Sequence, residues 1–402
     1  MKYIVLVGDG MSGRPLIDLN GRTCLEVAER RYMDEIVRKG RIGSATTIPP
    51  GMTPASDVAN LSILGYDPRK YYSGRGPLEA VNIGVKLHKE DVAFRCNLIT
   101  EIDDKLVDYS SGHISTKEST ILINGLDKEL SSQKIRFYPG VSYRHLMVLK
   151  TGSVEEAKRF SDIKCMPPHD IVGKPITKNL PQGTGKEMLI ELMRKSKYIL
   201  SMDDINKVRI DLNENPANMI WLWGQGVMPS MPLFKELHGV TGSIISAVDL
   251  IKGIGKIIGL DVIDVPGATG YYDTNFKGKG EYALKALETK DFVFVHVEAA
   301  DEAGHNGDIR AKITAIENFD KLVVGTIWEE FKNRRDFRIL LLPDHATPIT
   351  VRTHTTDPIP FAICGNGVSP DSACVFTELA SNASSVFFKD GYHLMTHLIH
   401  LT

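Results

Sequence analysis

The sequence predicts an α/β protein in which a doubly wound core sheet is interrupted by a smaller α+β domain. Short apolar strands alternate with amphipathic helices near the start of the chain and again over its second half. This alternation is typical of a mostly parallel sheet with helices on both faces. Polar side chains follow several of these strands directly, at the edge where open α/β sheets place their chemistry. From about residue 85 to residue 179 the pattern changes to strands, one helix and a hairpin.

Composition excludes several classes of protein. The 402 residues suffice for one large domain and a smaller one. Lys and Arg together number 48 against 50 for Asp and Glu, so no broad basic surface predicts a nucleic-acid partner. The five cysteines are scattered, which is typical of reduced intracellular thiols. The apolar run at the start of the sequence is too short for a secretory signal. The sequence has no run of 18 apolar residues, so it does not predict a membrane partner. We therefore expect a cytoplasmic location, and the sequence does not indicate an oligomeric state.

The first strand is predicted at Tyr3–Val7 and ends at Asp9, which lies between two glycines. Such a turn is either a tight connection or a way to expose a carboxylate to a metal ion. Helical spacing follows over Thr23–Lys39, and Thr23 with Glu26 matches a capping box. A neighbouring strand is expected at Arg41–Ile48.

A proline-rich loop then leads to Ser56. Val58, Leu61 and Leu64 follow helical spacing, which puts Ser56 at the N-terminus of a helix. The free N–H groups and the positive dipole of such an end favour a phosphate or an oxyanion, although a serine there can also be a simple cap. Arg75, between two glycines, is suited either to a phosphate contact or to exposure to solvent.

Residues 85–179 are predicted to form the inserted α+β domain, which leaves residues 1–84 and 180–402 for the core. Strands are expected at Phe94–Thr100 and Lys105–Tyr109, a helix at Ser119–Leu130 and a hairpin at Ile135–Lys150. A Pro- and Gly-rich segment, Pro167–Pro175, is expected to be the linker that leaves the insert. The polar candidates in the insert are Arg144, His145, His169 and Asp170, each of which also has a structural interpretation.

The core alternation is expected to resume after the insert. The expected elements are a helix at Gly185–Leu200, a strand at Met219–Trp223, a strand at Gly242–Val248, a helix at Asp249–Gly259, a strand at Leu260–Val265, a helix at Glu281–Leu287, a strand at Phe292–Val297, a long amphipathic helix at Ile309–Phe331, and strands at Phe337–Leu342 and Pro360–Cys364. Lys252, in the first turn of a helix that follows a strand, can either reach a site at the strand ends or lie on the surface.

Two of these strand ends carry the same pair of residue types, a carboxylate and an imidazole. Collected along the chain, the strand-end groups are Asp9, Ser56, Asp301, His305, Asp344, His345 and His354. Oxygen and nitrogen donors without thiolates favour two sites for Zn²⁺ or Mn²⁺. Two such ions, about 4 Å apart, can hold the attacking and leaving oxygens of a phosphoryl transfer. Metal contact would also lower the pKa of the Ser56 hydroxyl and make it a usable nucleophile.

The order of these motifs, Asp-Gly, Pro-x-Ser-Asp, Asp-x-x-x-His, Asp-His and His, resembles the alkaline phosphatase superfamily. Longer stretches resemble the archaeal-type cofactor-independent phosphoglycerate mutases and their bacterial relatives over nearly the whole chain. They include SDVANLSILGYDP, GRGPLEA, FRCNLIT, VPGATGYYDTN and HVEAADEAGHNGD. The resemblance implies an alkaline-phosphatase-like core. It also implies glycolytic interconversion of 3-phosphoglycerate and 2-phosphoglycerate through a phosphoserine, without 2,3-bisphosphoglycerate.

The resemblance also assigns roles to residues. One divalent ion (Mn, Zn or Mg) would be held by Asp301, His305 and His354, and a second by Asp9, Ser56, Asp344 and His345. Ser56 would carry the phosphoryl group. The residues facing the phosphorylated substrate would be Arg75, Arg144, His145, His169 and Lys252. The insert is the expected lid, because a mutase has to keep water away from its phosphoserine.

Three alternatives remain at this stage. One is a homoserine phosphotransferase, which bacterial members of the family have been proposed to be. The sequence has no Walker P-loop, because Gly253-Ile254-Gly255-Lys256 lacks the upstream glycine and the following Ser or Thr, so ATP would have to bind through the two ions. The second is a metal-dependent phosphomonoesterase, and the third is a metal-binding module without catalysis.

Overall fold

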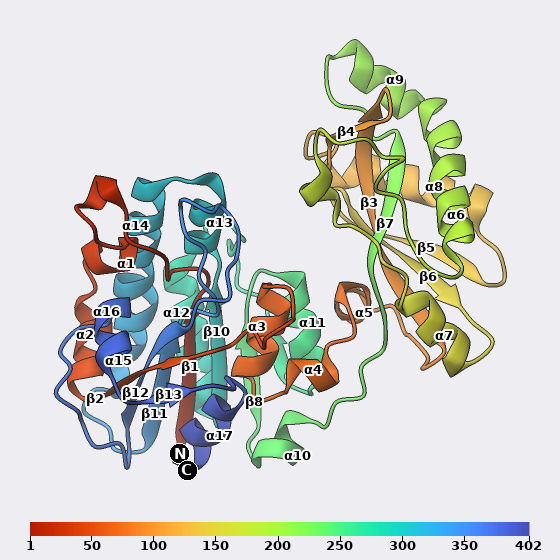
Figure 1. Ribbon diagram of the computed structural model, residues 1–402. Coiled ribbons are helices and arrows are strands. Elements are labelled where there is room, and N and C mark those ends of the chain that lie inside the picture. The colour runs from red at the N-terminus through yellow and green to blue at the C-terminus, as the bar shows by residue number, and fades with distance from the viewer. Residues whose placement is uncertain (402) are drawn as a thin grey trace. The chain divides into compact units, whose positions relative to one another are not determined.

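The computed structural model describes residues 1–401, which form two compact units. The core unit comprises residues 1–72 and 231–402, and the insert comprises residues 73–230 (Figure 1). No helix within residues 1–401 combines the length and the apolar character that crossing a membrane requires. The five cysteines are free thiols.

The core unit is built on one eight-stranded mixed sheet, which confirms the predicted α/β class. Its strand order is β13-β2-β12-β11-β1-β10-β8-β9. The strands are β1 (Lys2–Gly8), β2 (Gly40–Ala45), β8 (Gly242–Ile245), β9 (Asp261–Ile263), β10 (Phe292–Val297), β11 (Phe337–Leu342), β12 (Ile359–Gly365) and β13 (Phe387–Phe388). Strand β12 is antiparallel to both of its neighbours, β11 and β2, and the other pairings are parallel.

The register of the three central strands determines where the functional groups lie. Gly8 of β1 is paired with Val297 of β10, and Val7 is paired with Leu342 of β11. The chain therefore leaves all three strands at the same edge of the sheet. Residues that follow these strands, among them Asp9 and Asp344, are brought together although they are far apart in sequence.

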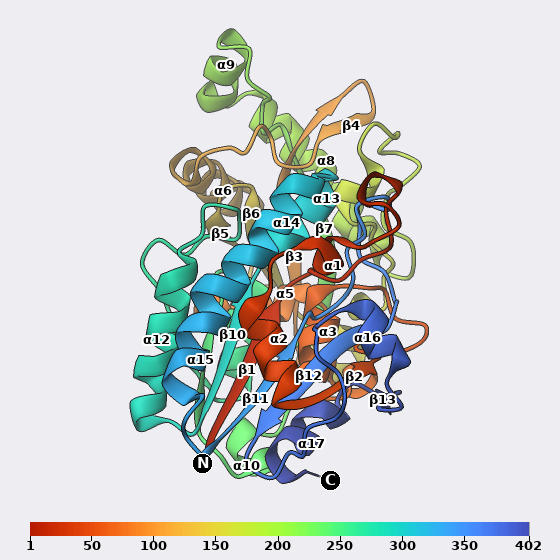
Figure 2. The ribbon, with the colours of Figure 1, turned by 90° about the vertical axis from the view of Figure 1, so that its left-hand side faces the viewer.

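Helices cover both faces of this sheet (Figures 1 and 2). On one face, α2 (Arg31–Arg38), α12 (Phe276–Thr289) and α15 (Gly325–Phe331) share an apolar cluster with Ile4 and Leu6 of β1. The opposite face carries α3 (Ser56–Ile63), α11 (Asp249–Ile257) and α17 (His393–His400). Because both faces are covered, the central strands are buried and read as continuous apolar runs. The remaining helical segments of the core are η1 (Ile17–Leu19), α1 (Cys24–Val27), α4 (Pro68–Tyr71), α10 (Phe234–His238), α13 (Ala299–Asn306), α14 (Ile309–Asn318), η3 (Phe319–Val324) and α16 (Glu378–Ala383).

Two of the predicted helices differ in the structure. The single helix expected at Thr23–Lys39 is two helices, α1 and α2, because Ala28 has an extended ψ of 145° that ends the first. The capping box between Thr23 and Glu26 is present. The helix expected at Glu281–Leu287 begins earlier, where the side chain of Asn275 caps α12. The helix predicted at Ile309–Phe331 is confirmed as α14, the π-helical turn η3 and α15 in succession.

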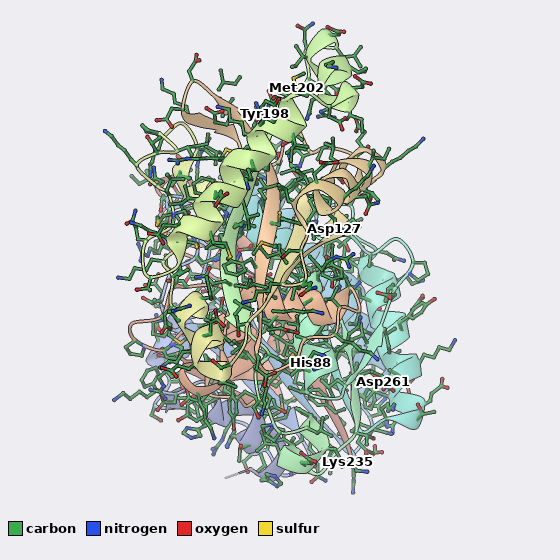
Figure 3. The ribbon with its side chains drawn as sticks, turned by 90° about the vertical axis from the view of Figure 1, so that its right-hand side faces the viewer. His88, Asp127, Tyr198, Met202, Lys235 and Asp261 are labelled. Carbon is green, nitrogen blue, oxygen red and sulfur yellow. The ribbon has the colours of Figure 1, made fainter. Side chains whose placement is uncertain are left out.

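The insert has its own five-stranded sheet and its own core. Its strands are β3 (Asp91–Ile102), β4 (Lys105–Asp108), β5 (Ile135–Val141), β6 (Arg144–Lys150) and β7 (Met219–Val227), and its helical segments are α5 (Arg75–Asn82), α6 (Thr116–Leu130), α7 (Val154–Ser161), η2 (Pro168–Ile171), α8 (Lys186–Ser201) and α9 (Asp204–Asp211). Apolar residues of α6 and α8 pack with those of β3 and β7 in one cluster. Tyr198 and Met202, near the end of α8, are 76% and 62% exposed (Figure 3).

The insert is larger than the predicted range of residues 85–179. We expected Met219–Trp223 to be a strand of the core sheet, but β7 is antiparallel to β3 and lies within the insert. An alternation pattern predicts a strand without naming its partner, which explains this error. The predicted linker is also wrong. Gly173 N–H donates to Leu106 O, and Pro175 bridges to Lys105, so this segment packs beside β4.

Candidate active site

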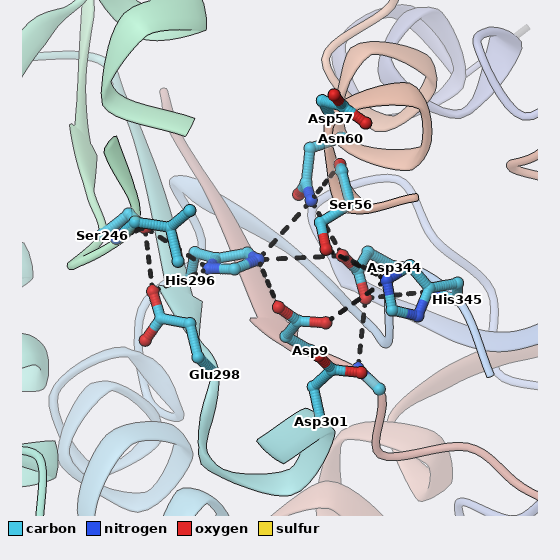
Figure 4. Close-up of polar contacts among 12 residues, drawn as sticks. Asp9, Ser56, Asp57, Asn60, Ser246, His296, Glu298, Asp301, Asp344 and His345 are labelled. Carbon is cyan, nitrogen blue, oxygen red and sulfur yellow. Dashed lines mark hydrogen bonds and ion pairs between the residues drawn. The ribbon is translucent and has the colours of Figure 1, made fainter. Parts of the chain in front are cut away.

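Four elements of the core unit bring predicted strand-end groups to one edge of the sheet (Figure 4). Asp9 follows β1 directly, and Asp344 and His345 follow β11. Ser56 is the first residue of α3, as predicted. Asp301 and His305 lie four residues apart in α13, and therefore on one face of that helix.

The first cluster consists of Asp301, His305 and His354. The Nε2 atom of His305 lies 3.1 Å from Asp301 Oδ2 and 2.9 Å from His354 Nε2. His354 Nε2 lies 3.5 Å from Asp301 Oδ1. Three donor atoms from two distant segments thus converge, with spacing suited to one cation. These are the three residues that the resemblance assigned to one ion.

The second cluster contains Asp9, Ser56, Asp344 and His345. Ser56 Oγ lies 3.1 Å from His345 Nε2. The same nitrogen lies 3.6 Å from Asp9 Oδ1 and 3.6 Å from Asp344 Oδ2. Both carboxylates are buried, whereas Ser56 is partly exposed. The serine hydroxyl is thus the accessible member of a buried set of oxygen and nitrogen donors.

The charges of the second cluster are suited to a bound cation. Burial, followed by the neighbouring carboxylates of Asp344 and Asp301, raises the pKa of Asp9 well above its usual range. Asp9 Oδ1 is buried and has no hydrogen-bond partner, and an unpaired buried carboxylate oxygen is costly. A divalent cation would satisfy this oxygen and offset the clustered negative charge. The donors are oxygen and nitrogen atoms, as in Zn²⁺ and Mn²⁺ sites, whereas Mg²⁺ prefers oxygen donors.

Asp344, Asp301 and His345 are in the protonation states in which they can bind a cation. Burial alone would raise the pKa of Asp344, but the charge of His345 in its protonated form and the neighbouring His296 together outweigh burial and lower the pKa below its usual range. In Asp301 burial is likewise outweighed, by His354 and His305, so its pKa is also lowered. Burial lowers the pKa of His345 to about 4, so this imidazole is neutral near pH 7 and offers a lone pair.

Three polar residues that the sequence analysis did not single out support these groups. Asn60 Nδ2 donates to Ser56 O at 2.8 Å and to Asp344 Oδ2 at 2.9 Å. Thr347 Oγ1 donates to Asp301 Oδ1. Buried Lys312 donates to the carbonyl oxygens of Ser12 and Thr347, at 3.1 and 2.7 Å. Lys312 thereby ties together the loops that follow β1 and β11.

The fourth imidazole of the site, that of His296, lies at the second cluster. His296, next to the C-terminal end of buried strand β10, has Nε2 3.3 Å from Asp9 Oδ2 and 3.7 Å from Asp344 Oδ2. Burial would lower its pKa, but the contacts with the carboxylates of Asp344 and Glu298 outweigh burial and raise the pKa to about 9. From the sequence, His296 was predicted only as part of a strand. A signal was present, because two polar residues, His296 and Glu298, interrupt an otherwise apolar segment.

The predicted substrate residues are more dispersed. Lys252 of α11 forms an ion pair with Asp264, with 2.6 Å between Nζ and Oδ1. In the insert, the Arg75 guanidinium lies 5.4 Å from the Trp223 ring centre, and the His169 ring lies 5.4 Å from the same ring. Arg144 is exposed, and its guanidinium carbon lies 5.2 Å from the centre of the Tyr143 ring.

Buried Arg95 joins this insert cluster and was not predicted. Its guanidinium lies 4.5 Å from the Trp223 ring centre, and its Nε lies 3.0 Å from Glu79 Oε1. Arg95 and Asn97 are two residues apart in β3, so they project from one face of the sheet. Arg144 is paired with Asn97 across the β3–β6 ladder and shares that face. This face of the insert is therefore cationic and aromatic, with Arg144 exposed on it and Arg95 and Trp223 buried beneath its surface.

His145 was predicted to face the substrate, and the structure contradicts this. Its side chain is 1% exposed, and Nδ1 accepts a hydrogen bond from Gly140 N–H at 3.0 Å. Burial lowers its pKa to about 3. His145 follows Arg144 in β6, so the two side chains point to opposite faces of the sheet. His145 belongs to the interior of the insert.

The fold and the two donor clusters define an α/β protein with a candidate metal site at one edge of its core sheet. Comparison with known proteins identifies the family. Residues 37–206 match the family model described as PhosphMutase, 2,3-bisphosphoglycerate-independent phosphoglycerate mutase. The protein of that name from Methanothrix thermoacetophila is 50% identical over 400 residues, covering 99% of this chain and 100% of the relative. Its namesake from Methanosarcina mazei is 54% identical over 364 residues, covering 90% of each chain.

Solved structures show the same relationship. A Pyrococcus horikoshii protein superposes with a TM-score of 0.84 at 30% identity, covering 100% of this chain and 98% of its own. The cofactor-independent phosphoglycerate mutase of Thermoplasma acidophilum superposes with a TM-score of 0.67 at 28% identity, covering 100% of both chains. The chain belongs to the family of 2,3-bisphosphoglycerate-independent phosphoglycerate mutases.

Proposed function

We propose that this chain is a metal-dependent phosphoglycerate mutase that interconverts 3-phosphoglycerate and 2-phosphoglycerate without 2,3-bisphosphoglycerate. The names of its relatives support the reaction. The observation within this chain that carries the proposal is the position of Ser56. Its hydroxyl begins helix α3 and lies 3.1 Å from His345 Nε2, beside a buried set of carboxylates. A phosphoryl group on Ser56 would also meet the free N–H groups of the helix N-terminus.

Two divalent ions fit the donors, and the ligand sets are those that the resemblance implies. Asp301, His305 and His354 would hold one ion, and the second cluster, defined above, would hold the other. When bound, the ions offset the charge of the phosphate and lower the pKa of the Ser56 hydroxyl. The donor set is compatible with Mn²⁺, Zn²⁺ or Mg²⁺.

The reaction requires two phosphoryl transfers at Ser56. In the first, Ser56 Oγ bonds to phosphorus while the bond between phosphorus and the 3-oxygen breaks, and the serine proton ends on that departing oxygen. In the second, the 2-hydroxyl of the same glycerate bonds to phosphorus, the Oγ–phosphorus bond breaks, and serine regains a proton. Between the two transfers free glycerate has to stay bound and reorient, with water excluded.

We further propose that the insert holds the glycerate and excludes water. Its cationic face, on which Arg75 and Arg144 lie near the rings of Trp223, Tyr143 and His169, is suited to a carboxylate. Arginine binds carboxylates through two parallel hydrogen bonds and so fixes their orientation. A lid of this kind would separate a mutase from a phosphatase that uses the same serine.

Phosphorus NMR tests the function directly. The protein, loaded with Mn²⁺ and then exchanged into Mg²⁺ or Zn²⁺ to avoid paramagnetic broadening, is given 3-phosphoglycerate alone and in a second sample with ATP and homoserine. We expect 2-phosphoglycerate to appear in the first sample without inorganic phosphate. Release of phosphate alone would make the protein a phosphomonoesterase. Formation of phosphohomoserine without isomerisation would make it a phosphotransferase. Either result would replace the proposal.

A further inference from the structure

His296 lies between the two carboxylates of the second cluster, although it is absent from the ligand set that the motif order implies. The imidazole is completely buried in β10. Its Nε2 is 3.3 Å from Asp9 Oδ2 and 3.7 Å from Asp344 Oδ2 (Figure 4). Asp9 itself has a buried oxygen, Oδ1, without a hydrogen-bond partner. The three side chains converge closely enough to share a cation.

These distances resemble ligand spacing more than hydrogen-bond spacing. Charge-assisted N–H···O bonds are typically about 2.7–2.9 Å long. Donor atoms that surround one ion at about 2.0–2.2 Å lie roughly 3 to 3.7 Å from each other. The separations of His296 Nε2 from both carboxylates fall in the second range. So do the 3.6 Å separations of His345 Nε2, a ligand that the resemblance assigns, from Asp9 and Asp344.

The opposite side of the His296 ring faces hydrogen-bond acceptors. Nδ1 lies 3.1 Å from Glu298 Oε1, which also accepts from Ser246 Oγ at 2.9 Å and from Ala247 N–H at 3.1 Å. Ser246 Oγ lies 3.4 Å from Nδ1, but its own proton points to Glu298. Nδ1 therefore carries a hydrogen, and in the neutral ring this leaves the lone pair on Nε2, which faces the carboxylates.

The three imidazoles that the resemblance assigns to the ions share this arrangement. Nδ1 of His305 faces Arg352 O at 3.1 Å, and Nδ1 of His354 faces Pro54 O at 3.4 Å. Nδ1 of His345 lies 3.3 Å from Thr347 Oγ1, whose proton is donated to Asp301. In each case an acceptor holds Nδ1–H and Nε2 points into the cluster. Metal-binding histidines are oriented in this way.

Lys279 completes the support of His296. This lysine of α12 is fully buried, and its Nζ donates to Glu298 Oε2 at 2.8 Å and to the carbonyl oxygen of His296 at 2.9 Å. Burial raises the pKa of Glu298, but the Lys279 charge and the contact with His296 outweigh it and lower the pKa below its usual range. Glu298 is thus held as an ionised acceptor, and both ends of the His296 residue are fixed.

We propose that His296 is a nitrogen ligand of the ion at Asp9 and Asp344, and that Glu298 and Lys279 are its positioning residues. This inference rests on the proposed two-ion site. It adds a fifth protein donor to the second ion, beside Asp9, Ser56, Asp344 and His345. The second ion is therefore expected to bind in a more completely closed site than the first.

Cobalt substitution tests the proposal on the wild-type protein. Exchangeable imidazole N–H protons next to Co²⁺ give strongly shifted proton NMR signals, one for each coordinated histidine. Because Nδ1 of all four histidines is bonded to an acceptor, we expect four such signals, of which the one from buried His296 exchanges slowest with solvent. Three signals at full loading with two ions would overturn the proposal. Failure of the wild-type protein to bind two ions would instead overturn the two-ion site itself.

Variants give the second readout, which is metal affinity measured by competition with a chelator. His296→Asn should lose one shifted signal and weaken the binding of one of the two ions by at least about 10- to 100-fold. Replacing a residue that only supports a metal ligand usually lowers the affinity by this factor. Glu298→Gln should weaken the binding of the same ion to a smaller extent. His238→Asn is the matched control, because His238 is buried elsewhere in the core unit, with Nε2 3.3 Å from Leu64 O. Unchanged affinities for both ions in a folded His296→Asn protein would refute the assignment.

Discussion

Asn60 links the proposed nucleophile to a proposed metal ligand, and its removal allows a worked prediction. Its amide donates one hydrogen to Ser56 O and the other to Asp344 Oδ2. Asn60→Ala leaves both oxygens without this donor. A hydrogen bond to a charged group is worth about 1.5–3 kcal/mol, and each 1.36 kcal/mol corresponds to about a factor of ten. We therefore expect the second ion to bind roughly 10- to 100-fold more weakly.

The assay for Asn60→Ala is chelator competition combined with thermal unfolding. Ser62→Ala is the matched control, because Ser62 is buried in the same helix and donates to Thr47 O at 2.6 Å, with no contact to a proposed ligand. Both variants should lose stability, but only Asn60→Ala should lose affinity for the ion and mutase turnover. Equal ion affinity in Asn60→Ala and the wild-type protein would refute the claim that Asn60 positions Asp344.

Three further predictions follow from the site. Asp344→Asn should reduce turnover by at least about 100-fold, because it removes ligand charge that holds the ions, and the ions offset the charge of the phosphate. Chelation should abolish the turnover of the wild-type protein, and Mn²⁺ should restore it. In Asp344→Asn, Mn²⁺ should not restore turnover. The pKa values of His305 and His296 are raised to about 9 in the ion-free site. The protonated imidazoles therefore stabilise the folded state fully below about pH 6.5, and this stabilisation is lost as the pH rises through 9. Thermal unfolding should show the loss when a chelator is present and not when ions are bound. Arg144→Ala should raise phosphate release relative to isomerisation in the phosphorus NMR assay, and an unchanged ratio would remove Arg144 from the proposed carboxylate site.

The sequence predicted the strand ends better than the sheet partners. Asp9, Asp301 and Asp344 follow short apolar runs, and parallel strands bring such residues to one edge whatever their order in the sheet. The assignment of β7 to the core failed because strand alternation carries no information about the partner strand. The C-terminal boundary of the insert was misplaced for the same reason.

Buried polar groups were the hardest to predict. Lys279 and Lys312 lie in amphipathic helices, where a lysine is normally exposed, yet both are buried and donate to carbonyl oxygens. His296 alternates with apolar residues in a strand, and its role depends on Glu298, which becomes a partner only once the fold forms. His145 shows the opposite error to His296. It was predicted to face the substrate, like the exposed arginine beside it, but it lies in the interior of the insert.

The central claim is that the phosphoryl group passes through Ser56. Ser56→Ala removes one hydroxyl and should leave the fold and the binding of the ion at Asp301, His305 and His354 intact. The decisive measurement is the rate at which this variant, folded and loaded with ions, converts 3-phosphoglycerate to 2-phosphoglycerate in the phosphorus NMR assay. We predict no isomerisation above the background rate. Substantial isomerisation by Ser56→Ala would contradict the phosphoserine mechanism.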